Sequence, residues 1–511
     1  MHMDTLLLIS PSSNTFYTLS APLGISYLAN EITCCDVYGL DLDVYRHIFE
    51  MTQEKILETI MKIVELYDVT YVGISILEET MDESFKIANL CSDVGCTVIA
   101  GGILPTLYPE DMSEHFDYIV RGDSEKELAD LLLCLSTGQS TSHIQGLSFK
   151  KDNSWHHQGT PIGPNCKNNI IPEREIFDKF NFGYEYKTAR MITSRGCIYN
   201  CSFCTNRKID SKFCRRDIDD IINEVKYLIL EKKVEQITFS DDQFLGTTMN
   251  EYKAALEIID AIKDLLCDYN VRLSFQARAD HILTCYEKFP EFFYQLDAIS
   301  NYYNDNNKES HISTYGRQIR GIGIDIGIEA FSDSTLKYFR KGLNSKTNIN
   351  CLQIMSKYNI DIGVYMILFT PVVTIENIIT ELEHYYKYYL KNNYSSKLVF
   401  SNLFKPLVAY KGTDIYNFLK ESGDLINERY YKFKDLRVAA FYIVIQNELV
   451  SFCSNNKFTM IDMYNAVLNL AYKCKELNIE KNSILNNVIC EYYDSNIIAE
   501  VYSKYICNDI S

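Results

Sequence analysis

Three cysteines stand close together near the middle of the chain, where Cys197, Cys201 and Cys204 are separated by three and then by two residues. They follow a strand-like run at residues 189–194, so we expect their thiols on one short loop beyond the carboxyl end of a strand. A structural zinc site takes four ligands, and a fully ligated four-iron cluster takes four thiolates. Three thiolates on one loop therefore suit an iron–sulfur cluster in which one iron is left for another ligand.

This motif, with Phe203 directly before the last cysteine, resembles the radical S-adenosylmethionine (SAM) superfamily. The resemblance implies that Cys197, Cys201 and Cys204 are the catalytic and metal-binding residues and hold a [4Fe–4S] cluster. The amino and carboxylate groups of SAM would chelate the fourth iron, and an electron passed to the sulfonium would release a 5′-deoxyadenosyl radical. The alternative is that three of the chain's 17 cysteines fall together by chance, and the strands downstream argue against it.

Strand-like runs continue after the cysteines, and each ends in polar residues. We predict them at residues 234–242, 271–280, 323–330, 360–368 and 397–403, with helical stretches between them. Together with the run before the cysteines they indicate six β/α units, which we interpret as a partial, TIM-like (β/α)6 barrel open on one side. The polar segment 301–311 is either a substrate lid or a surface loop.

The chemistry of such a barrel lies at the carboxyl ends of its strands, and five polar residues are predicted there. The resemblance implies that these five residues and Phe203 bind SAM. The two aspartates would lie near the amino group of SAM, Glu329 would lie near its ribose, and Arg278 would be a countercharge to its carboxylate. Solvated acids, or a structural ion pair in the case of Arg278, would also explain them. The five residues are Asp241, Asp242, Gln276, Arg278 and Glu329.

Residues 1–145 alternate short apolar runs with helical stretches such as 52–66, 81–93 and 125–135. This alternation predicts an α/β domain with a doubly wound, Rossmann-like parallel sheet, in which ligands bind beyond the carboxyl ends of the strands. The glycine-containing turns after these runs resemble the cobalamin-binding domain that precedes many radical SAM cores. The resemblance implies that cobalamin contacts Leu23, Gly24, Ser75, Gly101, Gly102, Leu104, Pro105, Gly122 and Glu125.

Two departures from other cobalamin-binding proteins concern the lower face of the corrin. The chain has no Asp-x-His-x-x-Gly signature, and it has Leu104 where relatives often carry histidine. We therefore do not expect a histidine ligand to cobalt. The alternative to cobalamin binding is a domain that has kept its fold and lost its ligand.

The chain has 511 residues, too many for one ordinary core, and we predict four parts. They are a cobalamin-binding domain at 1–145, a linker at 146–185, the barrel at 186–420 and a helical domain at 421–511. The net charge of −18 argues against a nucleic-acid-binding face, and no apolar run reaches membrane length. There is no signal-peptide pattern and no regular cysteine framework, so we expect a cytoplasmic protein in a reducing compartment.

The resemblance favours a cobalamin-dependent methyltransferase that acts on an unactivated carbon of a natural-product or peptide substrate. One SAM would supply the methyl group through cobalamin, and a second would be cleaved at the cluster. Its partners would be that small-molecule or peptide substrate and an external electron donor such as flavodoxin or ferredoxin, with no nucleic acid and no membrane. One alternative keeps both cofactors but cyclises or rearranges its substrate. Another is a non-catalytic Fe–S electron-transfer protein, which needs a fourth cysteine, and the nearest candidate is Cys214.

Overall fold

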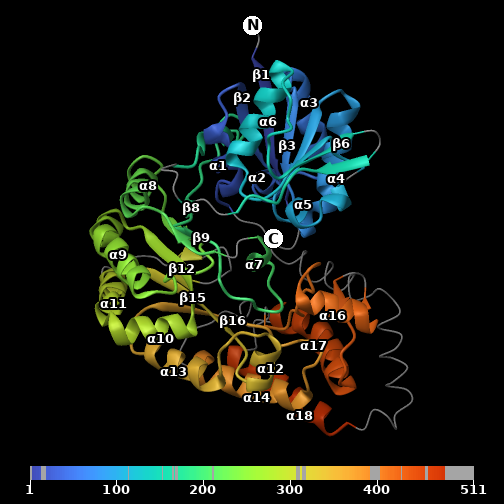
Figure 1. The fold of residues 1–511 in the computed structure, drawn as a ribbon. Coiled ribbons are helices and arrows are strands. Elements are labelled where there is room, and N and C mark those ends of the chain that lie inside the picture. Colours follow the sequence, from blue (N-terminus) through green and yellow to red (C-terminus); the bar gives the residue numbers. More distant parts are fainter. Residues whose placement is uncertain are drawn as a thin grey trace. The chain divides into compact units, whose positions relative to one another are not determined.

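The computed structural model divides the chain into two compact units (Figure 1). The first unit comprises Met1–Ile198 and Asn206–Asp241, and the second comprises Tyr199–Thr205 and Asp242–Ser511. Within the described residues no helix is long and apolar enough to span a membrane. The structure describes residues 3–477 except 13–18, 113, 152–153, 164–165, 167–170, 210–211, 306–310, 313–317, 392–402, 427–428 and 455–458.

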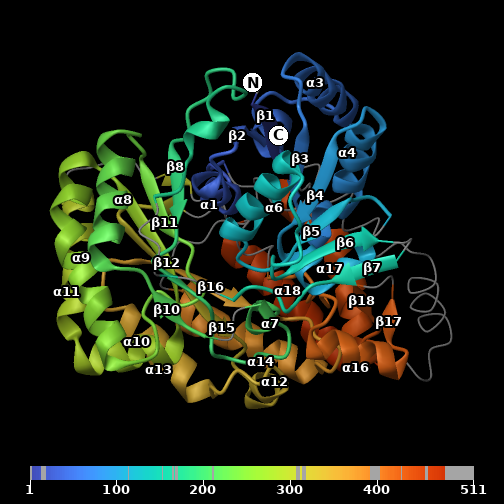
Figure 2. The ribbon, with the colours of Figure 1, turned by 45° about the horizontal axis from the view of Figure 1, so that its top comes forward.

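Seven strands form the main sheet of the first unit: β1 (Asp4–Ser10), β2 (Cys35–Asp41), β3 (Tyr71–Ser75), β4 (Thr97–Gly101), β5 (Tyr118–Val120), β6 (Leu147–Lys151) and β7 (Ser154–His157). Their order is β2-β1-β3-β4-β5-β6-β7. The first five strands are parallel, which confirms the predicted sheet. Strands β6 and β7 extend its edge antiparallel, as Figure 2 shows beside β5.

Helices cover both faces of this sheet. Helices α1 (Leu23–Glu31) and α6 (Glu125–Thr137) pack on one face, and α3 (Gln53–Leu66) and α4 (Met81–Asp93) pack on the other. Alternate residues of a strand point to opposite faces, so a strand covered on both sides has apolar residues at successive positions, as β1 has from Leu6 to Ile9. The doubly wound α/β class expected from the sequence is therefore confirmed.

The segment that we predict as a linker, 146–185, contributes β6 and β7 to the sheet. Most of β7 is exposed, so no buried apolar alternation marks it in the sequence. It is formed by pairing with β6, which in turn pairs with β5. The domain limits themselves stay predictions.

The strands that lead to the cysteines also belong to the first unit. Strand β8 (Thr188–Met191) is parallel to β11 (Gln236–Phe239), and β9 (Ser194–Arg195) is antiparallel to β10 (Cys214–Arg215). The backbone just before Cys197 is thus fixed by strand pairing.

The second unit contains three neighbouring parallel strands, β12 (Arg272–Arg278), β15 (Ile322–Glu329) and β16 (Asp361–Met366). Helices α9 (Met249–Tyr269) and α11 (Pro290–Asp305) accompany them (Figure 1). These strands confirm the runs predicted at residues 271–280, 323–330 and 360–368. The predicted sixth strand, at 397–403, lies outside the described residues except for its last position.

The carboxyl-terminal part is mainly helical as far as it is described, with one short antiparallel strand pair, β17 (Leu425–Ile426) and β18 (Tyr430–Tyr431). It contains α16 (Asp414–Ser422), α17 (Leu436–Ser454) and α18 (Met460–Lys475), and the helix expected at 484–506 lies outside the described residues. Of the segment 301–311, the first five residues are the end of α11 and the next five are not described.

Candidate functional site

The loop that carries the cysteines starts from β9 in the first unit. Gly196, directly before Cys197, has a φ of +81°, a left-handed conformation that favours glycine. Cys197 itself is half-buried. Pairing between β9 and β10 and the turn at Gly196 together set where the first thiol leaves the strand.

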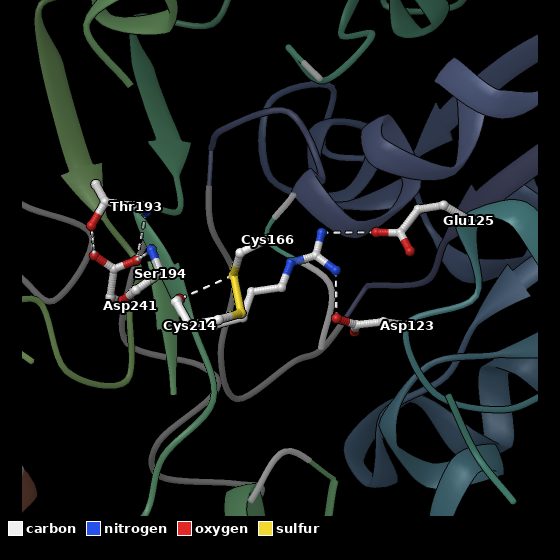
Figure 3. Close-up of a disulfide and its surroundings, with 8 residues drawn as sticks. Asp123, Glu125, Cys166, Thr193, Ser194, Cys214 and Asp241 are labelled. Atoms are coloured by element: carbon white, nitrogen blue, oxygen red, sulfur yellow. Dashed lines mark hydrogen bonds and ion pairs between the residues drawn. A yellow bond between two sulfur atoms is a disulfide. The ribbon is translucent and has the colours of Figure 1, made fainter. Parts of the chain in front are cut away.

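Asp241 holds the chain between β8 and β9. Its Oδ1 accepts hydrogen bonds from the backbone N–H groups of Thr193 (2.6 Å) and Ser194 (2.8 Å), and its Oδ2 accepts one from Thr193 Oγ1 (2.5 Å; Figure 3). Asp241 is 2% exposed, and burial raises its pKa against the opposing effects of Arg215 and these donors. Both oxygens are therefore engaged by the segment that leads to Cys197. The contact with the SAM amino group implied by the resemblance stays a prediction.

Arg195 ties the same segment to the turn after β5. Its guanidinium forms ion pairs with Asp123 and, at 2.8 Å, with Glu125, the first residue of α6 (Figure 3). The guanidinium also lies over the ring of Tyr27 in α1, 5.0 Å from the ring centroid. Glu125 was predicted to contact cobalamin, and in the structure its carboxylate pairs with Arg195. Sequence analysis did not single out Arg195, although its place two residues before Cys197 was a signal.

A disulfide joins Cys166 to Cys214, which lies opposite Arg195 in the β9–β10 pair (Figure 3). Cys214 was the nearest candidate for a fourth cluster ligand, and as a disulfide it offers no thiolate to iron. The bond also departs from our expectation for a reducing compartment. No regular cysteine spacing predicts it, since its partners are 48 residues apart.

In the second unit, Tyr199 is held by residues at the start of α10 (Ala279–Lys288). Its hydroxyl lies 2.5 Å from Nε2 of His281, and the guanidinium of Arg278 lies 3.6 Å from its ring centroid. Burial lowers the pKa of His281 to about 4, so its ring is neutral near pH 7. Arg278 also forms an ion pair with Asp280 and donates a 2.7 Å hydrogen bond to the carbonyl oxygen of Lys341. Arg278 thus supports the cysteine loop through Tyr199, and its contact with SAM stays a prediction.

The last part of the cysteine loop has further anchors in the second unit. The backbone N–H of Ser202 donates to the carbonyl oxygen of Phe339 at 2.9 Å, and the hydroxyl of Ser202 donates to the backbone carbonyl oxygen of Tyr338 at 2.8 Å. The ring of Phe203 packs edge-on against Phe339, with the centroids 5.1 Å apart. Phe203 therefore has a packing role beside the cofactor contact predicted for it. The two cysteines of the motif that lie in this unit, Cys201 and Cys204, are half-buried.

Glu329 ends β15 in a backbone conformation that is unusual for its residue type. Its φ is +62°, and its carboxylate accepts a 2.8 Å hydrogen bond from Nζ of Lys341. Non-glycine residues in this region cost about 1–3 kcal/mol and cluster at functional sites. Because the carbonyl of Lys341 also accepts from Arg278, the structure joins Glu329 and Arg278 through one lysine. Gln276 and Asp242, also in the second unit, are half-buried.

Two of the predicted cobalamin glycines leave the backbone open. A Cβ at Gly24 would meet nothing within 4 Å, and one at Gly101 would meet nothing closer than 3.8 Å. Such openings at the carboxyl edge of a parallel sheet fit the close approach of a large ligand. Leu23, next to Gly24, and Ser75, the last residue of β3, are both half-buried.

The other two glycines are required by the chain itself. Gly102 has a φ of +99°, and a Cβ there would lie 2.9 Å from the backbone nitrogen of Ile76. Gly122 has a φ of +93°, and a Cβ there would lie 2.2 Å from the carbonyl oxygen of Ile162. Leu104 is 4% exposed and belongs to the apolar core beneath the sheet, and the neighbouring Pro105 is also buried.

The far end of the cysteine loop returns to the first unit. Helix α7 (Asn206–Ile209) begins two residues after Cys204 and lies beside α5 (Ile103–Leu107), which follows the Gly101–Gly102 turn. Both ends of the cysteine loop are thus fastened to turns that were predicted to bind cobalamin.

Three half-buried thiols on an anchored loop are a donor set that fits an iron–sulfur cluster. Among the residues that the structure describes, no three His, Cys, Asp or Glu side chains are gathered to hold a single metal ion. A four-iron cluster does not need that convergence, because each thiolate binds a different iron.

Comparisons with known proteins agree with this site. The model of the radical SAM superfamily matches residues 191–384, and that of the B12 binding domain matches residues 13–132. The chain is a radical SAM enzyme with a B12 binding domain. Its cofactors are accordingly SAM, a [4Fe–4S] cluster and cobalamin, and as a radical SAM enzyme it needs a reductant and a substrate.

Three similar proteins illustrate the match. An uncharacterized methyltransferase of Pyrococcus horikoshii is 26% identical over 372 residues, which cover 70% of this chain and 72% of that protein. The 4′-phospho-dehydrooxetanocin synthase of Priestia megaterium is 24% identical over 317 residues, 58% of this chain but only 40% of that protein. The solved structure of the cobalamin-dependent SAM radical enzyme OxsB, with aqua-cobalamin and SAM bound, has a TM-score of 0.69 and 16% identity, and the match covers 98% of this chain and 76% of that one. This last likeness is one of fold.

Proposed function

We propose that this radical SAM enzyme methylates an unactivated carbon of a natural-product or peptide substrate. The observation that carries the proposal is that one compact unit holds both the turns of the B12 binding domain and the strand that leads to Cys197. When bound, the cofactors supply the methyl group and the 5′-deoxyadenosyl radical that removes hydrogen from the substrate. The chain itself supplies binding and orientation.

The residues have distinct parts in this proposal. Cys197, Cys201 and Cys204 hold the cluster, and Asp241 and Arg195 fix the strand from which the first of them leaves. In the second unit, Glu329 and Arg278 are held by Lys341, Asp280 and Tyr199 rather than by solvent. Their positions before cofactor binding are therefore largely set, which lowers the entropic cost of orienting a ligand.

Methyl transfer is favoured by the relative from Pyrococcus horikoshii, which is named as a methyltransferase and matches this chain over most of both lengths. A second candidate keeps both cofactors and cyclises or rearranges its substrate. It is kept because the relative from Priestia megaterium is named as a synthase and not as a methyltransferase.

The third hypothesis, a non-catalytic Fe–S electron-transfer protein, loses its support. It needs a fourth thiolate, and the nearest one, at Cys214, is bonded to Cys166. Flavodoxin or ferredoxin as electron donor, a cytoplasmic location and the lack of a nucleic-acid partner stay predictions, the last of them resting on the net charge of −18.

The two catalytic hypotheses differ in what they do to SAM. Protein reconstituted with iron and sulfide under anoxic conditions, reduced, and supplied with methyl-deuterated SAM should form S-adenosylhomocysteine only when cobalamin is present. The matched control is the same preparation without cobalamin. Formation of 5′-deoxyadenosine without any cobalamin-dependent S-adenosylhomocysteine would contradict methyl transfer and favour cyclisation or rearrangement.

A further inference from the structure

The side chains of Arg195, Asp123 and Glu125 form a nearly enclosed ionic group, which we call the 195 triad. They are 13%, 23% and 16% exposed. The triad carries two carboxyl groups for one guanidinium, and burial raises the pKa of Asp123 above its ordinary value. Removal of one partner from an enclosed ion pair is strongly destabilising, because it leaves an unpaired buried charge.

Each member of the triad is fixed by the backbone that carries it. Arg195 lies in β9 and pairs with Cys214 of β10. The turn with Asp123 is held by Ile162, whose carbonyl oxygen accepts from the backbone N–H of Asp123 at 3.0 Å. Glu125 opens α6, where a carboxylate is favoured by the helix dipole. A shift of the turn after β5 would therefore displace Arg195 and, two residues further along the chain, Cys197.

The triad has a counterpart at the other end of the cysteine loop. There α7 lies beside α5, which follows the Gly101–Gly102 turn. The contact of Arg195 with Tyr27 adds α1, whose first turn includes Gly24. The segments on either side of the cysteines thus touch the elements that follow β1, β4 and β5, which are the elements at the ligand edge of the sheet.

We propose that Arg195, through its ion pairs with Asp123 and Glu125, is a positioning residue that couples cobalamin binding to assembly of the iron–sulfur site. A ligand that orders the turn after β5 also orders the strand that presents Cys197. By thermodynamic linkage the effect is reciprocal, so a formed cluster tightens cobalamin binding by the factor by which cobalamin favours cluster formation. The inference rests on the cofactors of the enzyme and does not depend on methyl transfer.

The test measures the dissociation constant of hydroxocobalamin by equilibrium dialysis, once with apo protein and once after anoxic reconstitution with iron and sulfide. The wild type should bind cobalamin about fivefold or more tightly when the cluster is present, the lower end of ordinary coupling between sites. In Arg195→Gln both cofactors should still bind, but the ratio of the two constants should approach one. Iron per chain, measured with and without cobalamin, should lose its dependence on cobalamin in the same variant.

Matched variants separate coupling from a general loss of stability. Arg437 pairs with Glu376 and Asp435 at 2.8 Å each, so Arg437→Gln breaks a two-carboxylate pair of the same kind in the second unit and should keep the wild-type ratio. Arg195→Lys keeps a cation and should restore part of the coupling. If Arg195→Gln does not fold, Glu125→Gln leaves the pair with Asp123 and should reduce the ratio.

The proposal is overturned if the wild type shows no coupling, or if Arg195→Gln folds and keeps the wild-type ratio. Neither result would contradict the proposed methyl transfer, which is tested by the products formed from SAM. Equally, an enzyme that cyclises its substrate could show the full coupling.

Discussion

Replacement of Asp241 distinguishes two roles for one carboxyl group. The structure places it under the segment before Cys197, where it accepts hydrogen bonds from two backbone N–H groups and one hydroxyl. Asp241→Ala leaves those donors buried without their acceptor, and each orphaned donor costs about 1–3 kcal/mol. Three donors give about 3–9 kcal/mol, and we expect a value near the lower end, about 4 kcal/mol, for local opening of this segment. Asp241→Asn keeps one amide oxygen and should cost about 1–2 kcal/mol.

Hydrogen exchange measured by mass spectrometry reports this opening directly. A loss of about 4 kcal/mol corresponds to roughly a thousandfold faster exchange in peptides that cover Thr193 and Ser194. The apo protein is the right sample, because no cofactor then contributes to protection. Asp260, an exposed residue of α9 that pairs with Lys263, provides the control, and Asp260→Ala should leave exchange unchanged.

The opposite outcome would refute this reasoning. If exchange in Asp241→Ala matches the wild type while affinity for SAM falls, Asp241 acts on SAM as the resemblance implies and not on the loop. Faster exchange with unchanged intrinsic affinity for SAM supports the loop role.

Three further changes give expected outcomes for the apo protein. His281 has a pKa of about 4 in the folded protein against an ordinary 6.5, so the stability it contributes is present above pH 6.5 and is lost as the pH falls toward 4. Between these values the free energy of unfolding of the wild type should fall by up to about 1.4 kcal/mol per pH unit because of His281. His281→Gln should lack this part of the pH dependence, as measured by thermal melts across that range. Burial raises the pKa of Asp41 to about 8, so its effect has the opposite sign, and stability falls as the pH rises from about 4 to 8. Asp41→Asn should flatten that part of the plot of melting temperature against pH. Equal slopes in the variant and the wild type would contradict a buried, protonated carboxyl group. Gly122→Ala should lower the melting temperature by several degrees, because its Cβ would collide with Ile162, whereas Gly24→Ala, with open space around it, should not.

The local parts of the site were predictable from the sequence. Cysteine spacing, the strand before Cys197 and the glycine turns are written within short segments, so periodicity and turn chemistry were enough to find them. The parallel sheet of the first unit followed for the same reason. Strand β7 was missed because its residues are mostly exposed and carry no apolar alternation.

Contacts between distant segments were not predictable from one sequence. Arg195 meets its partners 72 and 70 residues away, and nothing local marks the pairing. Leu104 shows a different limit. The resemblance implied that it contacts cobalamin, and the structure places its side chain in the core, with the neighbouring Ile103 44% exposed. The contact of Leu104 with cobalamin stays a prediction.

The most direct test of the account is the formation of 5′-deoxyadenosine by matched cysteine variants. After anoxic reconstitution and reduction, the wild type and Cys214→Ser should both cleave SAM and carry similar amounts of iron per chain. Cys201→Ala should form no 5′-deoxyadenosine. Cleavage by Cys201→Ala, or loss of cluster iron in Cys214→Ser, would show that the cluster is not held by Cys197, Cys201 and Cys204.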